Sequence, residues 1–452
     1  MNRRTESLGR DPVGPLLLRL SLPGVVGMLV QASYNVVDAF FIGRGVGPLG
    51  LAGTAVAFPL QLLILAMGTF GGVGAQSLIS RSLGARDLPR AQGALDVLGA
   101  LSLVLGIATA LVGLAWLDPL LALVGGSGEI LPYARSYMRI ILLGVPALIL
   151  GIALSHAVRA EGDVRTSMHA MLVSAGANFL LDPLFIFGLH GGVAGAAWAT
   201  VLSQVVLVLW LLRHYRSGAS VLRLRPREFR FRRNLLGEIA AVGTSEWVRI
   251  SANALVVGAV VRSLALHGSP LAVAAYGIVS RLLSLAFMPL FGLTQGFMPL
   301  LGYNYGAGLH GRARQVLVLS LQAATAFSAV VWFLCLVFPS LLVAPFTAHE
   351  DLLALGSRSL RAMTLGFFLV GFQILGAATF QALGKARPAL FLSLSRQVLL
   401  FLPLLLLLPR WCGLWGVWLA FPLSDLLSAL LTLPFVLSQI RELEEVQSSR
   451  TP

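Results

Sequence analysis

Long apolar runs fill most of this chain, and only short polar connections separate them. Charged residues make up 12% of the sequence, whereas about a quarter of a soluble domain is charged. So few charges cannot cover a water-facing surface, and the high apolar content excludes a disordered chain. We therefore expect an all-α polytopic membrane protein, since about 20 consecutive apolar residues suffice for one helical span.

The breaks between the runs predict twelve transmembrane helices. Several runs are longer than a bilayer requires, which permits tilting or bending. Glycine and proline occur inside the spans, and membrane helices tolerate them because neighbouring groups satisfy the freed backbone. The expected spans are residues 15–42, 50–79, 94–117, 136–158, 168–187, 192–212, 235–265, 271–301, 316–338, 359–383, 389–408 and 414–440.

Basic residues gather in alternate connections between these spans. The connection 213–233 holds eight arginines, and the connections 81–90 and 159–165 are also arginine-rich. Most intervening connections are poor in them, although Arg358 and Arg361 follow span nine. Because cytoplasmic loops carry the basic residues, we expect both termini to be cytoplasmic, in the cell (inner or plasma) membrane. The net charge of +14 then faces an anionic lipid surface and not nucleic acid.

The chain also contains an internal repeat. Three segments recur with offsets of 221 or 222 positions, namely 83–86 with 305–308, 159–165 with 381–387, and 192–195 with 413–416. The repeat predicts two pseudo-symmetric six-helix lobes: an N-lobe (1–212), a basic cytoplasmic linker (213–233) and a C-lobe (234–452). With six spans in each lobe, the repeat axis runs along the membrane normal, an arrangement typical of alternating-access transporters.

Four polar residues in the N-lobe spans define a candidate site. An ionisable side chain within a span is costly and therefore indicates function. Asp38 lies in span one, Asn178 and Asp182 lie four residues apart in span five, and Thr200 lies in span six at a similar depth. Such oxygens can bind Na⁺ as metal ligands, and two neighbouring carboxylates can equally share a proton. Alternatively, Asp182 caps a helix end and Asp38 pairs with Arg44.

The repeat provides an internal comparison for this cluster. The C-lobe positions that correspond to the four residues, namely 258–260, Leu399, Pro403 and Phe421, are not acidic. A cluster found in one lobe only is more typical of a site than of a scaffold.

Several C-lobe charges form a second group of candidates. Glu246 and Arg249, three residues apart, favour a local ion pair. Arg281, Arg396 and Asp425 could pair with one another or face a cavity. Glu246, Arg281 and Asp425 are therefore a possible substrate site or secondary cation site.

Other motifs exclude catalytic chemistry. The sequence has no Walker motif and no zinc-ligand spacing, and Cys335 and Cys412 make neither a disulfide framework nor a metal site. The segment 71–74 is glycine-rich but lies mid-span, which favours close helix packing over phosphate binding. We expect no enzyme activity and no cofactor.

At these residues the chain resembles the MATE family (multidrug and toxic compound extrusion). The resemblance is carried by segments 34–43, 178–183, 195–200 and 299–308, and is greatest for the prokaryotic DinF-like branch. It implies a V-shaped two-lobe fold and the export of cationic or amphipathic drugs in exchange for H⁺ or Na⁺. Asp38, Asn178, Asp182 and Thr200 fall on the cation-coupling positions of that branch, and Glu246 matches a span-seven glutamate of some relatives.

Two alternatives remain open at this point. One is a lipid-linked sugar or polysaccharide flippase of the same superfamily, although such proteins usually have more spans and a strongly cationic cavity. The other is a non-transporting membrane receptor or scaffold, which neither the repeat nor the one-sided acidic cluster favours. Nothing in the sequence requires more than a monomer in the lipid bilayer.

Overall fold

A computed structural model describes residues 3–224 and 232–448, and every regular element in these two ranges is helical. Helices satisfy their own backbone hydrogen bonds, which a chain in hydrocarbon requires. The first half comprises α1 (Arg3–Arg10), α2 (Val13–Gly45), α3 (Pro48–Gly84), α4 (Leu88–Ala115), α5 (Leu117–Leu123), η1 (Gly128–Ile130), α6 (Leu131–Ala160), α7 (Val164–Pro183), η2 (Leu184–Gly188) and α8 (Gly192–Arg216).

The second half begins beyond the basic connection, part of which lies outside the described residues. It comprises α9 (Arg233–His267), α10 (Pro270–Gly306), α11 (His310–Val337), α12 (Pro339–Val343), η4 (Ala344–Phe346), α13 (Glu350–Thr364), η5 (Phe367–Leu369), α14 (Val370–Ala382), α15 (Ala386–Leu394), η6 (Ser395–Phe401), α16 (Leu402–Cys412) and α17 (Leu414–Ser448).

The predicted all-helical fold with twelve spans is confirmed. Within the described residues, 11 helices are long and apolar enough to cross a membrane, or 12 if one bent pair is a single span. That pair joins Glu350–Thr364 to Phe367–Ala382 at an angle of 44°. Helix α17 packs closely at this bend, since a Cβ on Gly366 would lie 2.9 Å from the Cβ of Asp425 and 3.0 Å from the Cα of Pro422, both on α17.

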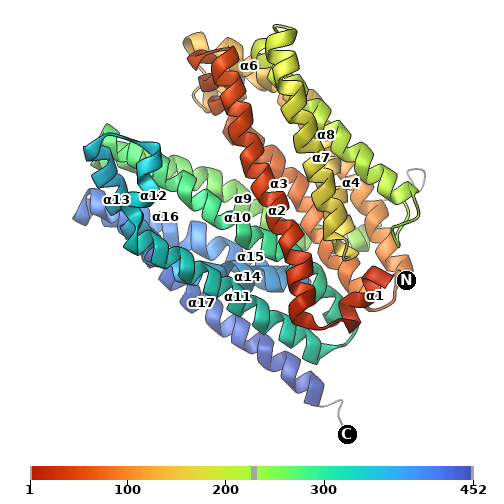
Figure 1. Ribbon diagram of the computed structural model, residues 1–452. Helices are drawn as coiled ribbons and strands as arrows, with labels where there is room; N and C mark the ends of the chain where they lie inside the picture. Colours follow the sequence, from red (N-terminus) through yellow and green to blue (C-terminus); the bar gives the residue numbers. More distant parts are fainter. Residues whose placement is uncertain (1–2, 225–231, 449–452) are drawn as a thin grey trace.

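The helices form two groups that meet at one end and diverge at the other (Figure 1). We use N-lobe for α2–α8 and C-lobe for α9–α17. The end where they meet, which also bears both chain termini, is called the closed end, and the opposite one the open end. Helices α2 and α10 cross near the closed end, as do α3 and α9.

Glycines allow the two lobes to approach so closely at the closed end. A Cβ on Gly84 of α3 would overlap the carbonyl oxygen of Tyr303, and one on Gly306 of α10 would overlap that of Arg81. A Cβ on Gly74 would likewise overlap the carbonyl oxygen of Ile239 on α9. The glycine-rich segment 71–74 therefore serves close helix packing, as predicted.

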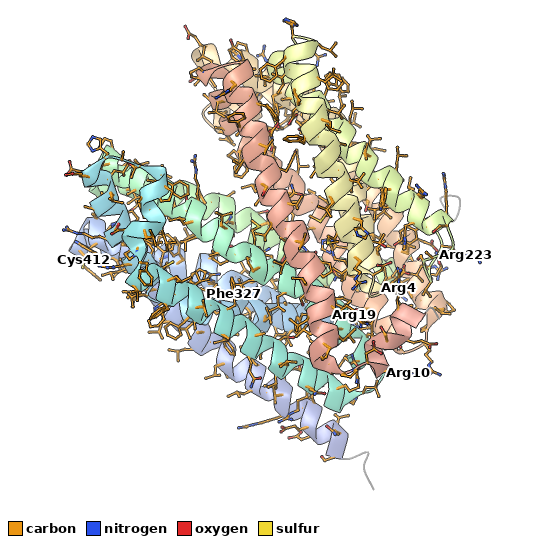
Figure 2. All side chains as sticks on the ribbon, in the orientation of Figure 1. Arg4, Arg10, Arg19, Arg223, Phe327 and Cys412 are labelled. Carbon is orange, nitrogen blue, oxygen red and sulfur yellow. The ribbon has the colours of Figure 1, made fainter. Side chains whose placement is uncertain are left out.

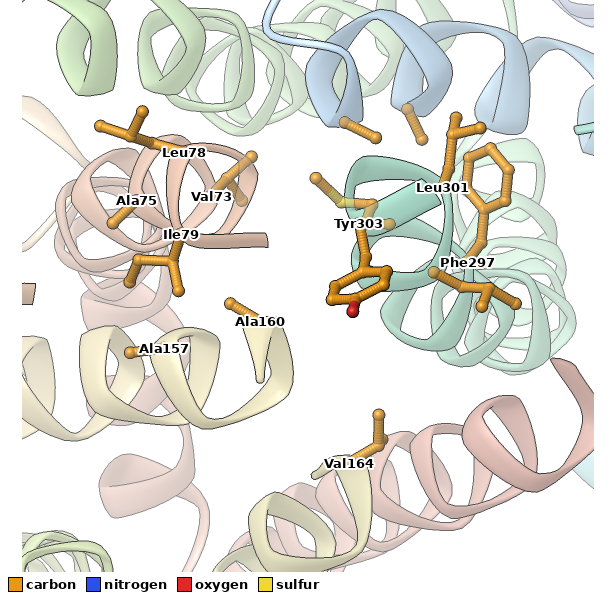
Figure 3. Close-up of a cluster of buried hydrophobic side chains, with 14 of the residues drawn as sticks. Val73, Ala75, Leu78, Ile79, Ala157, Ala160, Val164, Phe297, Leu301 and Tyr303 are labelled. Atoms are coloured by element: carbon orange, nitrogen blue, oxygen red, sulfur yellow. The ribbon is translucent and has the colours of Figure 1, made fainter. Parts of the chain in front are cut away.

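The largest apolar core lies at this junction and draws residues from both lobes. Figure 3 shows Val73, Leu78 and Ile79 of α3 together with Phe297 and Leu301 of α10. All five are buried. The closed end is thus stabilised by apolar packing across the lobes, whereas smaller cores lie within each lobe.

Candidate functional site in the N-lobe

Helix α7 contributes two neighbouring polar side chains to the N-lobe interior. Asn178 and Asp182 lie on one helix face and are both buried. The amide Nδ2 of Asn178 donates a hydrogen bond to Oδ1 of Asp182 at 3.3 Å. Directly after Pro183 the helix widens into the π-helical segment η2, a feature that is frequent at functional sites. The spacing of four residues therefore produces the contact that the sequence predicts.

Asp38 and Thr200 reach the same place from two other helices. Asp38 of α2 lies close enough to Asp182 for their charges to interact. Tyr34, one turn before Asp38 on α2, lies near Asp38, Asp182 and the hydroxyl of Thr200 on α8. The structure thus brings the four predicted residues together into one cluster built from three helices, which we call the N-lobe cluster.

Arg44 does not neutralise this cluster. Its guanidinium lies over the ring of Phe40, 4.9 Å from the ring centroid. No ion pair joins Arg44 to Asp38 among the described residues, so the alternative of a simple Asp38–Arg44 pair does not apply. Within the described ranges, the two interacting carboxylates of the cluster therefore have no basic partner.

Three buried oxygens of the N-lobe cluster have no hydrogen-bond partner within the described part of the chain. They are Oδ1 of Asp38, Oδ2 of Asp182 and Oγ1 of Thr200. A buried acceptor without a donor costs about 1–3 kcal/mol, and more if it is charged. Two carboxylates with neutral amide and hydroxyl oxygens suit a hard cation, and the same pair suits a shared proton.

A permanently bound transition metal fits this cluster poorly. No group of three or more His, Cys, Asp or Glu side chains that could hold a metal occurs in the residues that the structure describes. The oxygen ligands of this cluster suit a hard cation better than a transition metal that prefers nitrogen or sulfur ligands.

Sequence reasoning missed three residues that lie around the N-lobe cluster. Tyr34 had a signal, because it precedes Asp38 by four residues and so shares its helix face. Tyr137 of α6 lies near Asp38, Tyr34 and Thr200, and Gln61 of α3 lies beside Tyr137. Neither Tyr137 nor Gln61 could be found from spacing, because only the tertiary packing of α3 and α6 places them there.

Glu246 of α9 forms a local ion pair, the interpretation that its spacing from Arg249 favours. Nη2 of Arg249 lies 2.5 Å from Oε1 of Glu246, and Nε lies 2.9 Å from Oε2. The carboxamide of Gln381 donates to Glu246 at 3.4 Å and to Ser245 at 3.1 Å. The guanidinium also lies over the Phe291 ring, at 5.2 Å from its centroid. Glu246 is therefore fully partnered.

Of the other C-lobe candidates, Asp425 pairs with Arg396, whereas Arg281 stands apart from both ion pairs. Nε of Arg396 donates to Oδ1 of buried Asp425 at 2.9 Å, and Gln373 donates to the Asp425 carbonyl oxygen at 2.6 Å. Arg281 of α10 is exposed and joins neither ion pair in the described ranges. The structure thus does not gather Glu246, Arg281 and Asp425 into one site.

Eleven or twelve helical spans around a buried acidic cluster define a polytopic membrane transport protein. The model of the family described as MatE matches residues 23–184 and 251–407, which is most of the chain. The chain belongs to the MATE family and, as such, is a transporter and not an enzyme.

Curated relatives match along nearly the whole chain. The multidrug export protein MepA of Staphylococcus aureus (strain MSSA476) is 27% identical over 423 residues, which is 93% of each protein. The protein of the same name from Staphylococcus haemolyticus (strain JCSC1435) is 29% identical over 423 residues, again 93% of each.

Solved structures of MATE transporters share the fold. The MATE multidrug transporter DinF-BH, solved as a complex, is 37% identical, with a TM-score of 0.90 over 97% of this chain and 98% of that one. An outward-facing conformation of a multidrug resistance MATE family transporter is 26% identical, with a TM-score of 0.91 over 98% and 99%.

Proposed function

We propose that this protein is a secondary active antiporter that exports cationic or amphipathic organic compounds in exchange for H⁺ or Na⁺. The observation that carries the proposal is the set of three unpartnered oxygens on Asp38, Asp182 and Thr200, buried together in one lobe. Leaving such groups unsatisfied is costly, and a cation or proton that enters would relieve the cost. The site is therefore expected to bind and release the coupling ion in each cycle.

Each residue of the N-lobe cluster has a distinct expected role. Asp38 and Asp182 provide the negative charge that attracts the cation. Asn178 holds one oxygen of Asp182 in place through its hydrogen bond, and Thr200 supplies a neutral oxygen. Tyr34 and Tyr137 close the cluster beside Asp38. Neutralising the two carboxylates removes buried charge, so the surrounding helices can pack differently.

The closed end is the expected cytoplasmic end, and the structure then represents an outward-facing state. The arginine-rich connections of the sequence are at this end, which supports the assignment. The likeness to an outward-facing MATE structure supports it further. Both termini are then cytoplasmic in the plasma membrane. The division into lobes at residues 213–233 and the monomeric state stay predictions. The family model matches two separate segments of the chain, one on each side of residues 213–233, which supports the division into lobes.

An inward cation gradient can provide the required driving force. One positive charge that moves down a potential of ~100 mV releases roughly 2.3 kcal/mol, before any concentration difference is added. Closure of one end and opening of the other would deliver the substrate to the far side, as alternating access requires.

The substrate class rests on relatives and on exposed apolar side chains of the N-lobe. MepA is named a multidrug export protein, and DinF-BH is named a multidrug transporter. In this chain Val36 and Phe40 of α2 and Phe58 of α3 are exposed apolar side chains in the open half of the N-lobe. Apolar and aromatic side chains on the helices around the N-lobe cluster suit amphipathic cations.

Arg281 stays a candidate for substrate contact on the C-lobe, whereas Glu246 and Asp425 are committed to ion pairs. Arg281 lies 11 residues, about three helical turns, before Gly292 on α10. A Cβ on Gly292 would clash with the backbone of Val25 of α2, so this helix face points toward the N-lobe. Arg281 is expected to face the same way, in the open half of the protein.

Transport of a fluorescent organic cation in reconstituted vesicles tests the proposal. Export that requires a proton or sodium gradient supports it, and the two gradients applied separately identify the coupling ion. A lipid-linked sugar flippase would instead move a labelled glycolipid and ignore the dye, and a receptor or scaffold would move neither. Loss of gradient dependence in the intact protein would contradict the proposal.

A further inference from the structure

The short helix α1 lies across the closed end and bonds to both lobes. It precedes the first span, and its eight residues are mostly polar. Figure 2 shows Arg4 and Arg10 at this end, and their side chains are 60% and 76% exposed. The opposite face of α1 is buried, with Thr5 at 1% and Leu8 at 0% exposure. A terminal helix buried on one face in this way is docked and not free.

The first half of α1 bonds to the N-lobe through the loop between α6 and α7. Arg4 forms an ion pair with Asp163, and the hydroxyl of Thr5 donates to the carbonyl oxygen of Glu161 at 3.0 Å. The Leu8 side chain packs on the same loop, since a Cβ on Gly162 would lie 3.1 Å from it.

The second half of α1 bonds to the C-lobe. The amide Nδ2 of Asn304, on α10, donates to the carbonyl oxygen of Leu8 at 2.9 Å. Nη2 of Arg312, on α11, donates to the carbonyl oxygens of Leu8 at 3.3 Å and Asp11 at 2.8 Å. A Cβ on Gly9 would lie 3.0 Å from the Tyr303 ring. Leu8 is thus the point where the two lobes are joined through α1.

The bonds to the C-lobe are built so that they can break at low cost. Asn304 also donates to the carbonyl oxygen of Leu300 at 2.8 Å, and Arg312 also donates to Oδ1 of Asn304 at 3.1 Å. If α1 moved away, Nδ2 of Asn304 would keep its bond to Leu300 and Nε of Arg312 would keep its bond to Asn304, while Nη2 of Arg312 would turn to water. The carbonyl oxygens of Leu8 and Asp11 would then turn to water, which replaces a lost hydrogen bond at little net cost.

Motion of the N-lobe must move α1. Only Asp11 and Pro12 separate α1 from α2. A Cβ on Gly24 of α2 would lie 3.2 Å from the Cβ of Gln295, so α2 and α10 are in close contact here. Parting the lobes at the closed end therefore pulls α1, which is anchored on the N-lobe, away from Asn304 and Arg312.

We propose that α1 is an interlobe strap: it stabilises the closed end while it is bonded to Asn304 and Arg312, and it releases them when that end opens. The inference rests on the proposed alternating-access function. It assigns to α1 control over the balance between the two access states, without any contact with substrate or coupling ion. Weakening the strap shifts the balance toward the state that is open at this end.

Distance measurements between spin labels test the strap directly. One pair at Leu88 and Glu445 spans the closed end, and another at Leu123 and Leu341 spans the open end, in protein with Cys335→Ala and Cys412→Ser replacements. The test variants are Leu8→Ala and Thr5→Val. The controls are Leu18→Ala, a leucine that is 72% exposed on α2, and Arg10→Ala on the exposed face of α1.

The expected result is a shift of the populations by about tenfold in both test variants, with a longer distance at the closed end and a shorter one at the open end. The two controls should match the unmodified protein. Unchanged distributions in folded Leu8→Ala and Thr5→Val proteins would overturn the strap.

A crosslink provides a second test, which holds α1 on the C-lobe instead of releasing it. A Cβ on Gly9 would lie 3.6 Å from the Leu309 side chain, so Gly9→Cys with Leu309→Cys can be bridged by a short, reducible thiol reagent. The bridged protein should stay closed at this end and stop exporting, and reduction should restore both. Full opening while bridged would contradict the proposal.

These outcomes separate the strap from the proposed function. The distance measurements need no transported compound, so a protein that fails to export any cation could still show the strap. Conversely, ion-coupled export together with unchanged label distances in the test variants would support the proposed antiport and contradict the proposed role of α1.

Discussion

Both carboxylate oxygens of buried Glu161 accept hydrogen bonds from the hydroxyl of Ser220, at 2.7 and 2.8 Å. The amide of Val221 donates a further bond to Glu161 at 2.8 Å. The connection that leaves α8 is therefore fixed to the same α6–α7 loop that holds α1. In the described part of the chain, the loop around Glu161 is a common anchor for the strap and for the start of the basic linker.

Glu161 should make stability depend on pH. It lies outside the membrane spans, and burial raises the pKa of its carboxyl from an ordinary value of 4.5 to about 7. Between these values the folded protein holds a proton that the unfolded chain has lost, so stability falls as pH rises through this window and levels off above it. The total effect is at most about 3.4 kcal/mol.

The matched variant for this prediction is Glu161→Gln, which cannot titrate. Thermal unfolding in detergent at several pH values from 5 to 8 should show the unmodified protein losing stability relative to Glu161→Gln as pH increases. The neighbouring charges Asp163 and Arg4 are present in both proteins, so the comparison isolates the carboxyl of Glu161. Parallel pH profiles would show that Glu161 does not titrate in this range.

Asp38 and Asp182 should be required for coupled export. Asp38→Asn and Asp182→Asn keep the side-chain shape but remove the charge that binds the cation, and a buried amide costs less than a buried carboxylate. We expect export under a gradient to fall about a hundredfold, the low end of the effect of removing a side chain that transfers a proton, with membrane insertion retained. The measurement is dye export from vesicles.

A matched control separates this effect from a general loss of acidic charge. Asp118→Asn removes an aspartate that pairs with Arg135 and whose side chain is 57% exposed, outside the N-lobe cluster. Its export should equal that of the unmodified protein. Normal export by both cluster variants would make the N-lobe cluster structural and would move the search to Arg281.

Much of the fold could be predicted because the membrane imposes it on the sequence. Long apolar runs form the membrane spans, because they match the thickness of the bilayer, and arginines gather in the connections on one side of it. The strap helix α1 had no such signal, since its polar sequence looks like any mobile terminus. The bend between α13 and α14 was also hidden, because the close approach of α17 to Gly366 is a tertiary contact that the local sequence does not indicate.

The candidate site was predictable where spacing along one helix defines a contact. Asn178 and Asp182 are four residues apart on α7, and Glu246 and Arg249 are three apart on α9. Contacts between helices were not predictable in this way. Tyr137 and Gln61 lie near the cluster only because α6 and α3 pack there. The Arg396–Asp425 pair was one of several pairings that the sequence allowed.

Labelling from outside the cell should establish the orientation. Ser217 is exposed in the connection after α8, whereas Ser220 is partly buried against Glu161, so Ser217→Cys is the better probe. With Cys412 replaced, an impermeant thiol reagent should fail to label Ser217→Cys in intact cells and should label it after lysis. Leu123→Cys, at the open end and 83% exposed, should be labelled in intact cells. The reverse pattern would place the closed end outside.

The ion pair between Glu246 and Arg249 should be a stability element and not a coupling site. Glu246→Gln leaves the partly buried guanidinium of Arg249 without its carboxylate, and breaking a buried pair from one side costs up to roughly 3–5 kcal/mol. Replacing both members, Glu246→Gln with Arg249→Met, removes the uncompensated charge, so most of the lost stability should return. Thermal unfolding of the two variants measures this recovery, and dye export should recover with it. If the double variant were stable but could not export, Glu246 or Arg249 would take part in transport, and the resemblance of Glu246 to the span-seven glutamate of some relatives would favour Glu246.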